Sequence, residues 1–198
     1  LVQGVTVVRG QALSDGGGTY QLWRDVVRQM LLFTPVTDFQ AGVLRELVPD
    51  IATLLGQEIE AAPTLNGTAA NQRIRNTVID LFRMQVEPMV LLLEDLQWAD
   101  EGLSILEQLS QITQALPVMI VANYRDDERP SLPDALMDMT HIPLSRLTPE
   151  TIADLSASML GDVGSQPHVV ELLNRETEGN VFFVVEVLRA LAEEAGSL

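Results

Sequence analysis

The residues best suited to chemistry in this sequence are two adjacent carboxylates, Glu94 and Asp95, that directly follow an apolar run. Residues 89–93 are continuously hydrophobic, which is typical of a strand buried on both faces of a parallel sheet. Parallel sheets bind ligands at the carboxyl ends of their strands. A pair of carboxylates there can hold Mg²⁺ and position an attacking water, as in nucleotide hydrolases. The alternative interpretation is that both side chains only mark the end of the strand and face solvent.

A second apolar run also ends in polar and charged residues. The run over residues 118–122 predicts another buried strand, and Asn123 and Arg125 follow it. The planar guanidinium of an arginine pairs bidentately with phosphate oxygens, so Arg125 is a candidate phosphate contact. The alternative partner for this guanidinium is a neighbouring carboxylate: Asp126, Asp127 or Glu128.

The elements that would position these residues alternate between helix and strand. Strands are expected over residues 5–8, 89–93, 118–122 and, in a shorter form, 141–144. Apolar residues at helical spacing predict helices over residues 19–31, 43–55 and 68–85, and another between Asp100, as N-cap, and Pro117. Helices that alternate with buried strands indicate an α/β fold with a parallel sheet and crossover helices.

After residue 147 the sequence predicts helices only. Thr148 and Pro149 are suited to cap and start a helix that Gly161 ends, and Pro167 starts a shorter one. A last helix follows Gly179, with its inward face formed by Val181, Val184, Leu188 and Leu191. We therefore expect an α/β domain over residues 1–147 and a small helical domain over residues 148–198, with the boundary at 146–148.

The composition excludes several classes of function. All 12 basic residues are arginines, against 28 acidic ones, and the net charge is -16. Without lysine, these 198 residues hold neither Schiff-base chemistry nor a complete phosphate-binding P-loop of the G-x-x-x-x-G-K-[ST] type. So acidic a chain is unsuited to nucleic acid as its principal ligand. The lack of cysteine, and the 27 positions between His141 and His168, leave no zinc-binding spacing.

No segment of the sequence predicts export or membrane insertion. The longest apolar run is far shorter than a bilayer span, and no signal peptide is visible, so we expect a cytoplasmic location and no membrane partner. The first residue is Leu1 rather than methionine, which suggests a segment of a longer protein.

The stretch that contains both carboxylates resembles a known family. Residues 91–100 read Leu-Leu-Leu-Glu-Asp-Leu-Gln-Trp-Ala-Asp. They are similar to the Walker B region of the STAND branch of AAA+ ATPases, in particular the ATPase modules of bacterial LuxR-type regulators, adenylyl cyclases and serine/threonine kinases. That family has histidine where this sequence has Gln97. The resemblance implies that Glu94 and Asp95 are Mg²⁺ ligands and catalytic residues, with Glu94 in the metal position and Asp95 in the catalytic one. Trp98 is expected to pack beneath this loop.

A second stretch resembles the same family in the expected order. Residues 118–128 are similar to its fourth strand and its sensor 1 segment, with Asn123 in place of a threonine. The exchange keeps a hydrogen-bonding side chain. The resemblance implies that Asn123 and Arg125 contact the nucleotide, with Arg125 reaching toward the γ-phosphate as a catalytic residue.

A third stretch resembles the helical lid of the family. Residues 178–183 are similar to its Gly-Asn-Pro-Phe-Phe motif, with Val181 in place of the proline. The resemblance implies nucleotide contacts from Gly179, Asn180 and Val181. We also expect Phe182 or Phe183 to lie in the core of the helical domain.

The resemblance covers about residues 5–191 and implies a P-loop NTPase-like parallel sheet with a C-terminal helical lid. The first strand and the P-loop of the family are not among these residues. Because the family orders its strands 5-1-4-3-2, the missing first strand would lie between the strands at 118–122 and 141–144. Unpaired strand edges at that gap would favour self-association.

We therefore expect a fragment of an ATP-binding and ATP-hydrolysing switch domain from a bacterial signalling or transcription-regulating protein. ATP or ADP, Mg²⁺ and other domains of the intact protein would be its partners, and this chain alone would bind nucleotide weakly and be inactive. The first alternative is a degenerate, non-hydrolysing scaffold that mediates protein contacts. The second is an unrelated α/β enzyme with Glu94 and Asp95 as metal ligands.

Overall fold

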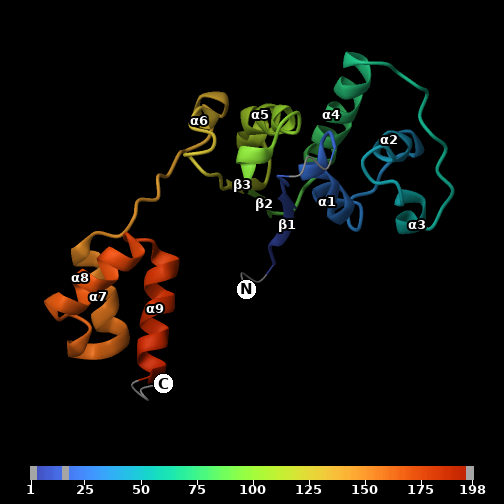
Figure 1. The fold of residues 1–198 in the computed structure, drawn as a ribbon. Helices are drawn as coiled ribbons and strands as arrows, with labels where there is room; N and C mark the ends of the chain where they lie inside the picture. The colour runs from blue at the N-terminus through green and yellow to red at the C-terminus, as the bar shows by residue number, and fades with distance from the viewer. Residues whose placement is uncertain (1–3, 15–17, 195–198) are drawn as a thin grey trace. The chain divides into compact units, whose positions relative to one another are not determined.

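The computed structural model describes residues 4–14 and 18–194 and divides the chain into two compact units, Leu1–His141 and Ile142–Leu198. The first unit combines helices with a three-stranded parallel sheet, and the second is helical (Figure 1). The α/β class expected from the sequence is therefore confirmed. Within the described residues, no helix is long and apolar enough to cross a membrane.

Three parallel strands form the sheet of the first unit, in the order β1-β2-β3. They are β1 (Thr6–Gln11), β2 (Met89–Glu94) and β3 (Val118–Ala122), so three of the expected strands are confirmed. Leu91 of β2 lies beside Val8 of β1 and Ile120 of β3, so the three carboxyl ends fall at the same end of the sheet. The residues that follow the strands are thereby brought together.

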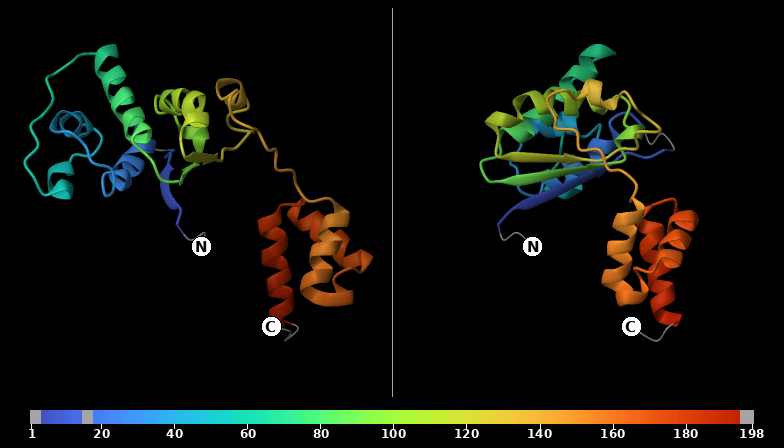
Figure 2. Two further views of the ribbon diagram at one scale, coloured as in Figure 1. Left: turned by 180° about the vertical axis from the view of Figure 1, so that it is seen from behind. Right: turned by 90° about the vertical axis from the view of Figure 1, so that its left-hand side faces the viewer.

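One face of the sheet packs against helices (Figure 2). The helices that contribute most of this core are α1 (Gln21–Met30), α4 (Thr68–Arg83) and α5 (Leu103–Ile112). Trp23 and Phe82 meet edge to face inside it with their ring centroids 6.1 Å apart, and neither is exposed. The α1, α4 and α5 helices predicted from apolar spacing are therefore present, and their apolar faces form the core as expected. A 3-10 turn, Thr113–Ala115, continues from α5 toward β3.

Helix α1 lies directly against β1 because of Gly10. A Cβ atom at this position would lie 2.3 Å from the carbonyl oxygen of Leu22 and 2.7 Å from Cγ2 of Val26, both on α1. Only a residue without a side chain fits there. The glycine thus sets how closely the first helix covers the sheet.

The opposite face of the sheet carries apolar side chains that are exposed. Side chains alternate between the two faces of a strand, and the register places Val7, Val90 and Met119 in one row and Leu92 and Val121 in the next. Val7, Met119 and Val121 are 52%, 64% and 40% exposed. We call these five residues the open face.

The two outer edges of the sheet differ. On β1, the N–H of Arg9 donates to Oε1 of Gln29 at 3.1 Å, and Nε2 of Gln29 donates to the carbonyl oxygen of Arg9 at 2.8 Å. On β3, the N–H of Asn123 and the carbonyl oxygen of Pro117 bond to residues of β2. Backbone groups of a parallel strand point alternately to its two sides, so those of Val118, Ile120 and Ala122 point outward. Among the described residues, these outward groups have no hydrogen-bond partner.

The prediction of one helix over residues 43–55 is wrong, because the structure has two shorter helices in this region. They are α2 (Asp38–Leu44) and α3 (Ile51–Leu55). The first starts earlier than expected because Thr37 and Gln40 form a capping box, in which the Thr37 hydroxyl oxygen accepts from the N–H of Gln40 at 3.2 Å. Pro49 lies between the two helices and disfavours helical backbone in the residue before it.

The strand expected over residues 141–144 is also wrong, since this segment has no regular secondary structure. Ile142 and Leu144 are 74% and 95% exposed. Pro143 lies between them and has no N–H for a ladder, which excludes it from the middle of a sheet. A short helix, α6 (Leu132–Ala135), is the last helix or strand of the first unit in the described residues.

The described part of the second unit contains helices α7 (Pro149–Leu160), α8 (Pro167–Thr177) and α9 (Val181–Glu194), with a 3-10 turn, Gly161–Val163, after α7. Thr148 caps α7 as expected, since its hydroxyl oxygen accepts from the N–H of Thr151 at 3.4 Å. The unit has its own small core, whose fully buried members are Ile152, Leu173, Val184 and Leu188.

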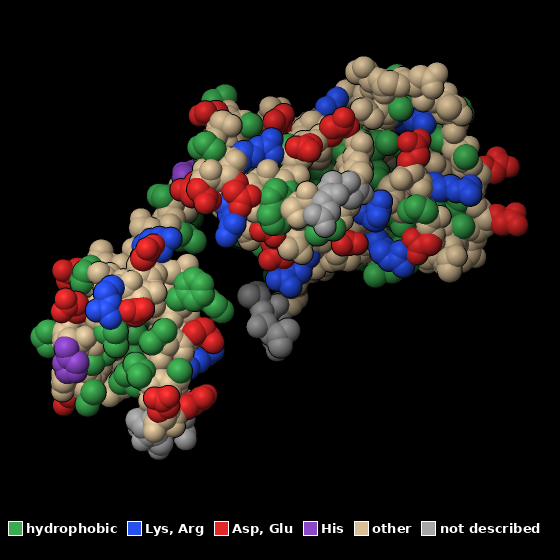
Figure 3. Space-filling model, viewed as in Figure 1, with side chains coloured by type: hydrophobic (Ala, Val, Ile, Leu, Met, Phe, Trp, Pro, Cys, Tyr) green, Lys and Arg blue, Asp and Glu red, His purple; other side chains and the backbone are tan. Residues whose placement is uncertain are grey.

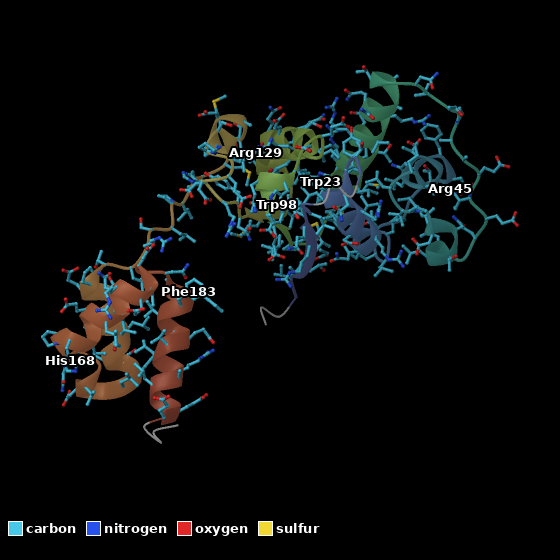
Figure 4. The ribbon with its side chains drawn as sticks, in the orientation of Figure 1. Trp23, Arg45, Trp98, Arg129, His168 and Phe183 are labelled. Carbon is cyan, nitrogen blue, oxygen red and sulfur yellow. The ribbon has the colours of Figure 1, made fainter. Side chains whose placement is uncertain are left out.

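The inward face of α9 is only partly the one expected, with Val184 and Leu188 confirmed. Val184, Leu188 and Ala192 are buried, whereas Phe182 and Phe183 are 65% and 53% exposed. Figure 4 labels Phe183 near the start of α9. Val181 is half exposed as well. The expected core positions of Val181 and of one phenylalanine are therefore wrong, because the buried stripe follows the four-residue spacing from Val184.

Candidate functional site

Hydrogen bonds around Asp95 join the carboxyl ends of all three strands. The N–H of Asp95 donates to Oδ1 of Asn123 at 3.0 Å, and the N–H of Asn123 donates to the carbonyl oxygen of Leu93 at 3.0 Å. Nε2 of Gln11, the last residue of β1, donates to Oδ2 of Asp95 at 2.7 Å. Asp95 itself has a left-handed backbone with φ of 59°, which aspartate adopts more readily than most residues.

Gln97 connects the Asp95 carboxylate to the segment that carries Arg125. It lies in the 3-10 turn Leu96–Trp98, between β2 and α5, and is only 8% exposed. Its Nε2 donates to Oδ1 of Asp95 at 3.3 Å, and its Oε1 accepts from the backbone N–H of Arg125 at 3.0 Å. We call the linked residues the strand-end cluster: Gln11, Asp95, Gln97, Asn123 and Arg125.

The guanidinium of Arg125 pairs with a carboxylate. Its Nη1 donates to Oε1 of Glu128 at 2.6 Å, so the ion pair that the sequence left open as an alternative is present. This hydrogen bond, with the negative charges of Glu128, Asp127 and Asp95, raises the pKa of the Arg125 guanidinium above its ordinary value. Arg125 is therefore a permanent cation, and its Nη1 is the nitrogen that Glu128 occupies.

Trp98 does not pack beneath the loop, so that expectation is wrong. Its side chain is 37% exposed, and its Nε1 donates to Oε2 of Glu128 at 3.0 Å (Figure 4). Glu128 thus accepts from Trp98 with one oxygen and from Arg125 with the other. The large indole ring favours burial, but its N–H needs a hydrogen-bond acceptor. The acidic segment after β3 supplies that acceptor near the surface, so the side chain stays partly exposed.

Asp100 is not the N-cap of α5, which also corrects the sequence analysis. Gly102 occupies that position, and no side chain caps the helix. The chain makes a turn over these residues before the helix starts, and Arg129 stabilises it. Nη1 of Arg129 donates to the carbonyl oxygens of Ala99 and Leu96, at 2.5 and 3.3 Å.

Glu94 lines a separate feature, a shallow hollow of about 230 Å³ beside β1 and α1. The other residues that line this hollow are Arg9, Gly10, Gln11, Asp25, Arg28 and Gln29. Gln11 is shared by the hollow and the strand-end cluster, so the two features adjoin. The pair of carboxylates therefore spans both.

The donor chemistry of Glu94 and Asp95 fits Mg²⁺, which prefers carboxylate oxygens and water. Both oxygens of Asp95 already accept amide hydrogen bonds, from Gln11 and Gln97. Among the described residues, no group of three or more metal-binding side chains is present. A magnesium ion at this site would need water and phosphate oxygens as its further ligands.

Gly179, Asn180 and Val181 belong to the second unit, where they lead into α9. Gly179 has φ of 73°, and a Cβ there would lie 2.4 Å from the carbonyl oxygen of Leu147. The N–H of Leu147 donates to the carbonyl oxygen of Gly179 at 2.8 Å, so the segment before α7 is tied to the helical unit. The units divide at residues 141 and 142, a few residues before the boundary that the sequence suggested.

Asn180 and Gly179 have clear structural roles in that unit. Oδ1 of Asn180 accepts from the N–H of Phe182 at 3.0 Å and so satisfies a free donor at the start of α9. The glycine supplies the left-handed backbone and the close approach that the turn requires. Local structure is thus sufficient to explain both residue types.

Sequence reasoning missed two members of the strand-end cluster. Gln11 was not singled out, although a polar residue at the end of an alternating strand was an available signal. Gln97 was noted only as a departure from a family pattern. The Gln97 carboxamide has a donor group and an acceptor atom, as does the neutral imidazole of the histidine that the family has there.

No protein-family model matches this chain, and neither does any curated protein or solved structure. Function is therefore inferred from the residues of the site and their geometry.

Proposed function

We propose that this chain is part of an ATP-binding switch domain with the P-loop NTPase fold, of the STAND branch of AAA+ ATPases. The intact domain would bind ATP with Mg²⁺, hydrolyse it, and report its nucleotide state within a bacterial signalling or transcription-regulating protein. Its proposed partners are ATP, ADP and the other domains of that protein. Its proposed location is the cytoplasm.

The observation that carries this proposal is the junction between the carboxyl ends of β2 and β3. Asp95, from the Walker B-like stretch, donates its N–H to Asn123, from the sensor 1-like stretch, 28 positions away. Gln97 from the first stretch holds the N–H of Arg125 from the second. Two stretches that resemble separate parts of one nucleotide site thus meet at the end of the sheet where such folds bind nucleotides.

Each residue of the junction has a role in the proposal. Glu94 and Asp95 would hold Mg²⁺ and orient the attacking water, and Asn123 fixes the backbone of Asp95. Arg125 would leave Glu128 and contact the γ-phosphate. Mg²⁺, when bound, supplies positive charge for the transferring phosphoryl group.

The phosphate cradle is the part of the site that these residues do not supply. A P-loop needs its lysine, and the 198 residues contain none. The cradle would therefore come from sequence outside them. The helical unit would act as the lid, with Gly179, Asn180 and Val181 toward the nucleotide. This chain alone is expected to bind ATP weakly and not to hydrolyse it.

Self-association of the chain is part of the proposal. The outward backbone groups of β3 have no partner among the described residues, and the open face beside them is apolar. An unprotected strand edge recruits another strand. A second copy that adds its own β3 would pair these backbone groups and extend the sheet.

A second candidate function is a non-hydrolysing scaffold that mediates protein contacts. The ion pair between Arg125 and Glu128 favours it, because the guanidinium is occupied by a residue of the chain itself. The lack of lysine favours it as well. A G-x-x-x-x-G-K-[ST] sequence shortly before these residues in the longest protein product that contains them would favour the ATPase.

The test is ATP hydrolysis by the longest protein product that contains these residues. Asp95→Asn should abolish or strongly slow hydrolysis and leave ATP binding largely intact, because the carboxylate acts on the water. Arg125→Ala should instead reduce the preference for ATP over ADP. Asp154→Asn, on α7, is a control with the same chemical change. Equal hydrolysis rates in the wild type and Asp95→Asn would remove Asp95 from the catalytic role.

A further inference from the structure

Gln97 is a largely buried polar side chain whose two polar atoms are both used inside the strand-end cluster. Its Nε2 donates to Oδ1 of Asp95, and its Oε1 accepts from the backbone N–H of Arg125. The side chain is thus the direct link between the carboxylate after β2 and the segment after β3. No other side chain in the described residues bonds to both Asp95 and Arg125.

The chemistry of its partners fixes how the carboxamide is turned. A backbone N–H can only donate, so the oxygen of Gln97 must face Arg125. A carboxylate can only accept, so the nitrogen must face Asp95. Because the carboxamide is planar and rigid, a displacement of one end moves the other. A displacement of the Asp95 carboxylate can therefore move the acceptor oxygen that the backbone N–H of Arg125 bonds to.

We propose that Gln97 is a positioning residue that couples the Asp95 carboxylate to the backbone of Arg125. In the proposed function, on which its meaning rests, the coupling joins the metal side of the site to the phosphate side. A ligand that engages the Asp95 carboxylate competes for Oδ1 and weakens its bond to Nε2 of Gln97. The carboxamide then shifts, and with it the Oε1 atom that accepts the backbone N–H of Arg125. The Arg125 side chain is in this way released from, or returned to, Glu128 in step with the state of Asp95.

The experiment measures the coupling in the chain itself, without nucleotide. The backbone amide of Arg125 is followed by nuclear magnetic resonance, both its chemical shift and its hydrogen-exchange rate. Asp95→Gly removes the carboxylate and suits the left-handed backbone of this position. Gln97→Met keeps the length of the side chain and removes both hydrogen bonds. Gln85→Met is the matched control, because Gln85 is also partly buried and also bonds twice, to Thr34 and Leu81.

Asp95→Gly is expected to shift the Arg125 amide and to speed its exchange. Gln97→Met should speed that exchange by roughly three- to tenfold, the loss expected for one hydrogen bond. In the Gln97→Met background, Asp95→Gly should have no further effect on Arg125. Gln85→Met should leave the Arg125 amide as it is in the wild type.

An Arg125 amide that is unchanged by Asp95→Gly would overturn the coupling. So would an effect of Asp95→Gly that is equally large with and without Gln97. If Gln97→Met does not fold, Asp95→Gly alone tests the coupling. The proposal then requires that Asp95→Gly shift both the Arg125 amide signal and the side-chain NH₂ signals of Gln97. Absence of ATP hydrolysis in the longer protein would overturn the proposed function and leave these amide results unchanged, so the two failures are distinguishable.

Discussion

The β1 edge of the sheet is protected at Arg9, whereas no outward backbone group of the β3 edge is paired among the described residues. At β1, Gln29 hydrogen-bonds both backbone groups of Arg9, and α1 lies against the strand at Gly10. At β3, the outward backbone groups have no partner among the described residues, and Met119 and Val121 beside them are exposed. A protected edge ends a sheet, whereas an unprotected one accepts another strand. The β1 edge is thus protected at Arg9, although the outward backbone groups of Val7 and Gln11 have no partner among the described residues. None of the outward groups of β3 is paired there.

The difference bears on the proposed function. In the proposed family, the strand that precedes the P-loop lies beside the fourth strand, and the proposal takes β3 to be that fourth strand. The edge that is open in this chain is therefore the edge that such a strand would occupy. Figure 3 shows acidic, basic and apolar side chains interspersed over the visible surface of the first unit.

The largest effect is expected from a charge placed at the open edge. Val121→Lys should abolish the self-association of this chain, because lysine beside a free edge opposes the addition of a strand. Light scattering during size-exclusion chromatography, over a range of protein concentrations, measures the molar mass in solution. Val7→Lys is the matched control, since Val7 lies on the same open face but on β1. The assignment of the self-association interface to the β3 edge would be contradicted by any of three results. These are a Val121→Lys chain that still associates, a Val7→Lys chain that dissociates, or a monomeric wild type.

A smaller effect is expected at the closed side of the sheet. Gly10→Ala should lower the free energy of unfolding by about 1–3 kcal/mol, because its methyl group would push α1 away from β1. Denaturant unfolding measures the loss. Gly102→Ala is the control, since a Cβ there would lie 3.4 Å from the Trp23 ring, an ordinary contact, and the backbone is helical. Equal losses in the two variants would show that the fit at Gly10 does not hold the helix in place.

The smallest effect is expected from the side chain that protects the β1 edge. Gln29→Met should cost about 1 kcal/mol of stability, because it removes two partly exposed hydrogen bonds to Arg9. Exchange of the Arg9 amide should become faster. Gln72→Met, on the surface of α4, should change stability by less than about 0.5 kcal/mol. An Arg9 amide that exchanges as in the wild type would mean that Gln29 does not protect the edge.

The sequence predicted the strands well because their signals are local. Two of them are continuous apolar runs that end in charge, and β1 is a short β-branched segment. The helices α1 and α4 were found because one apolar stripe runs through each. The errors came where a proline or a cap competes with the stripe, as at Thr37, Pro49 and Pro143.

The candidate site was only partly predictable, for a physical reason. The sequence located Asp95, Asn123 and Arg125, because polar residues that follow buried strands meet at one end of a sheet. It could not show that Glu128 binds Arg125, since three neighbouring carboxylates compete for the guanidinium. Nor could it show that Gln97 bridges two loops. Such bonds depend on the tertiary arrangement of the turns rather than on any spacing along the chain.

The most direct measurement of the central claim is a calorimetric titration with Mg²⁺ and ATP, carried out in parallel on two proteins. One is this 198-residue chain, and the other is the longest protein product that contains it. We predict tight, Mg²⁺-dependent binding by the longer protein, and weak or undetectable binding by the chain, which lacks the lysine of a phosphate cradle. Equally tight binding by both proteins would contradict the claim that this chain holds only part of the site. An absence of binding by the longer protein would contradict its assignment as an ATP-dependent switch.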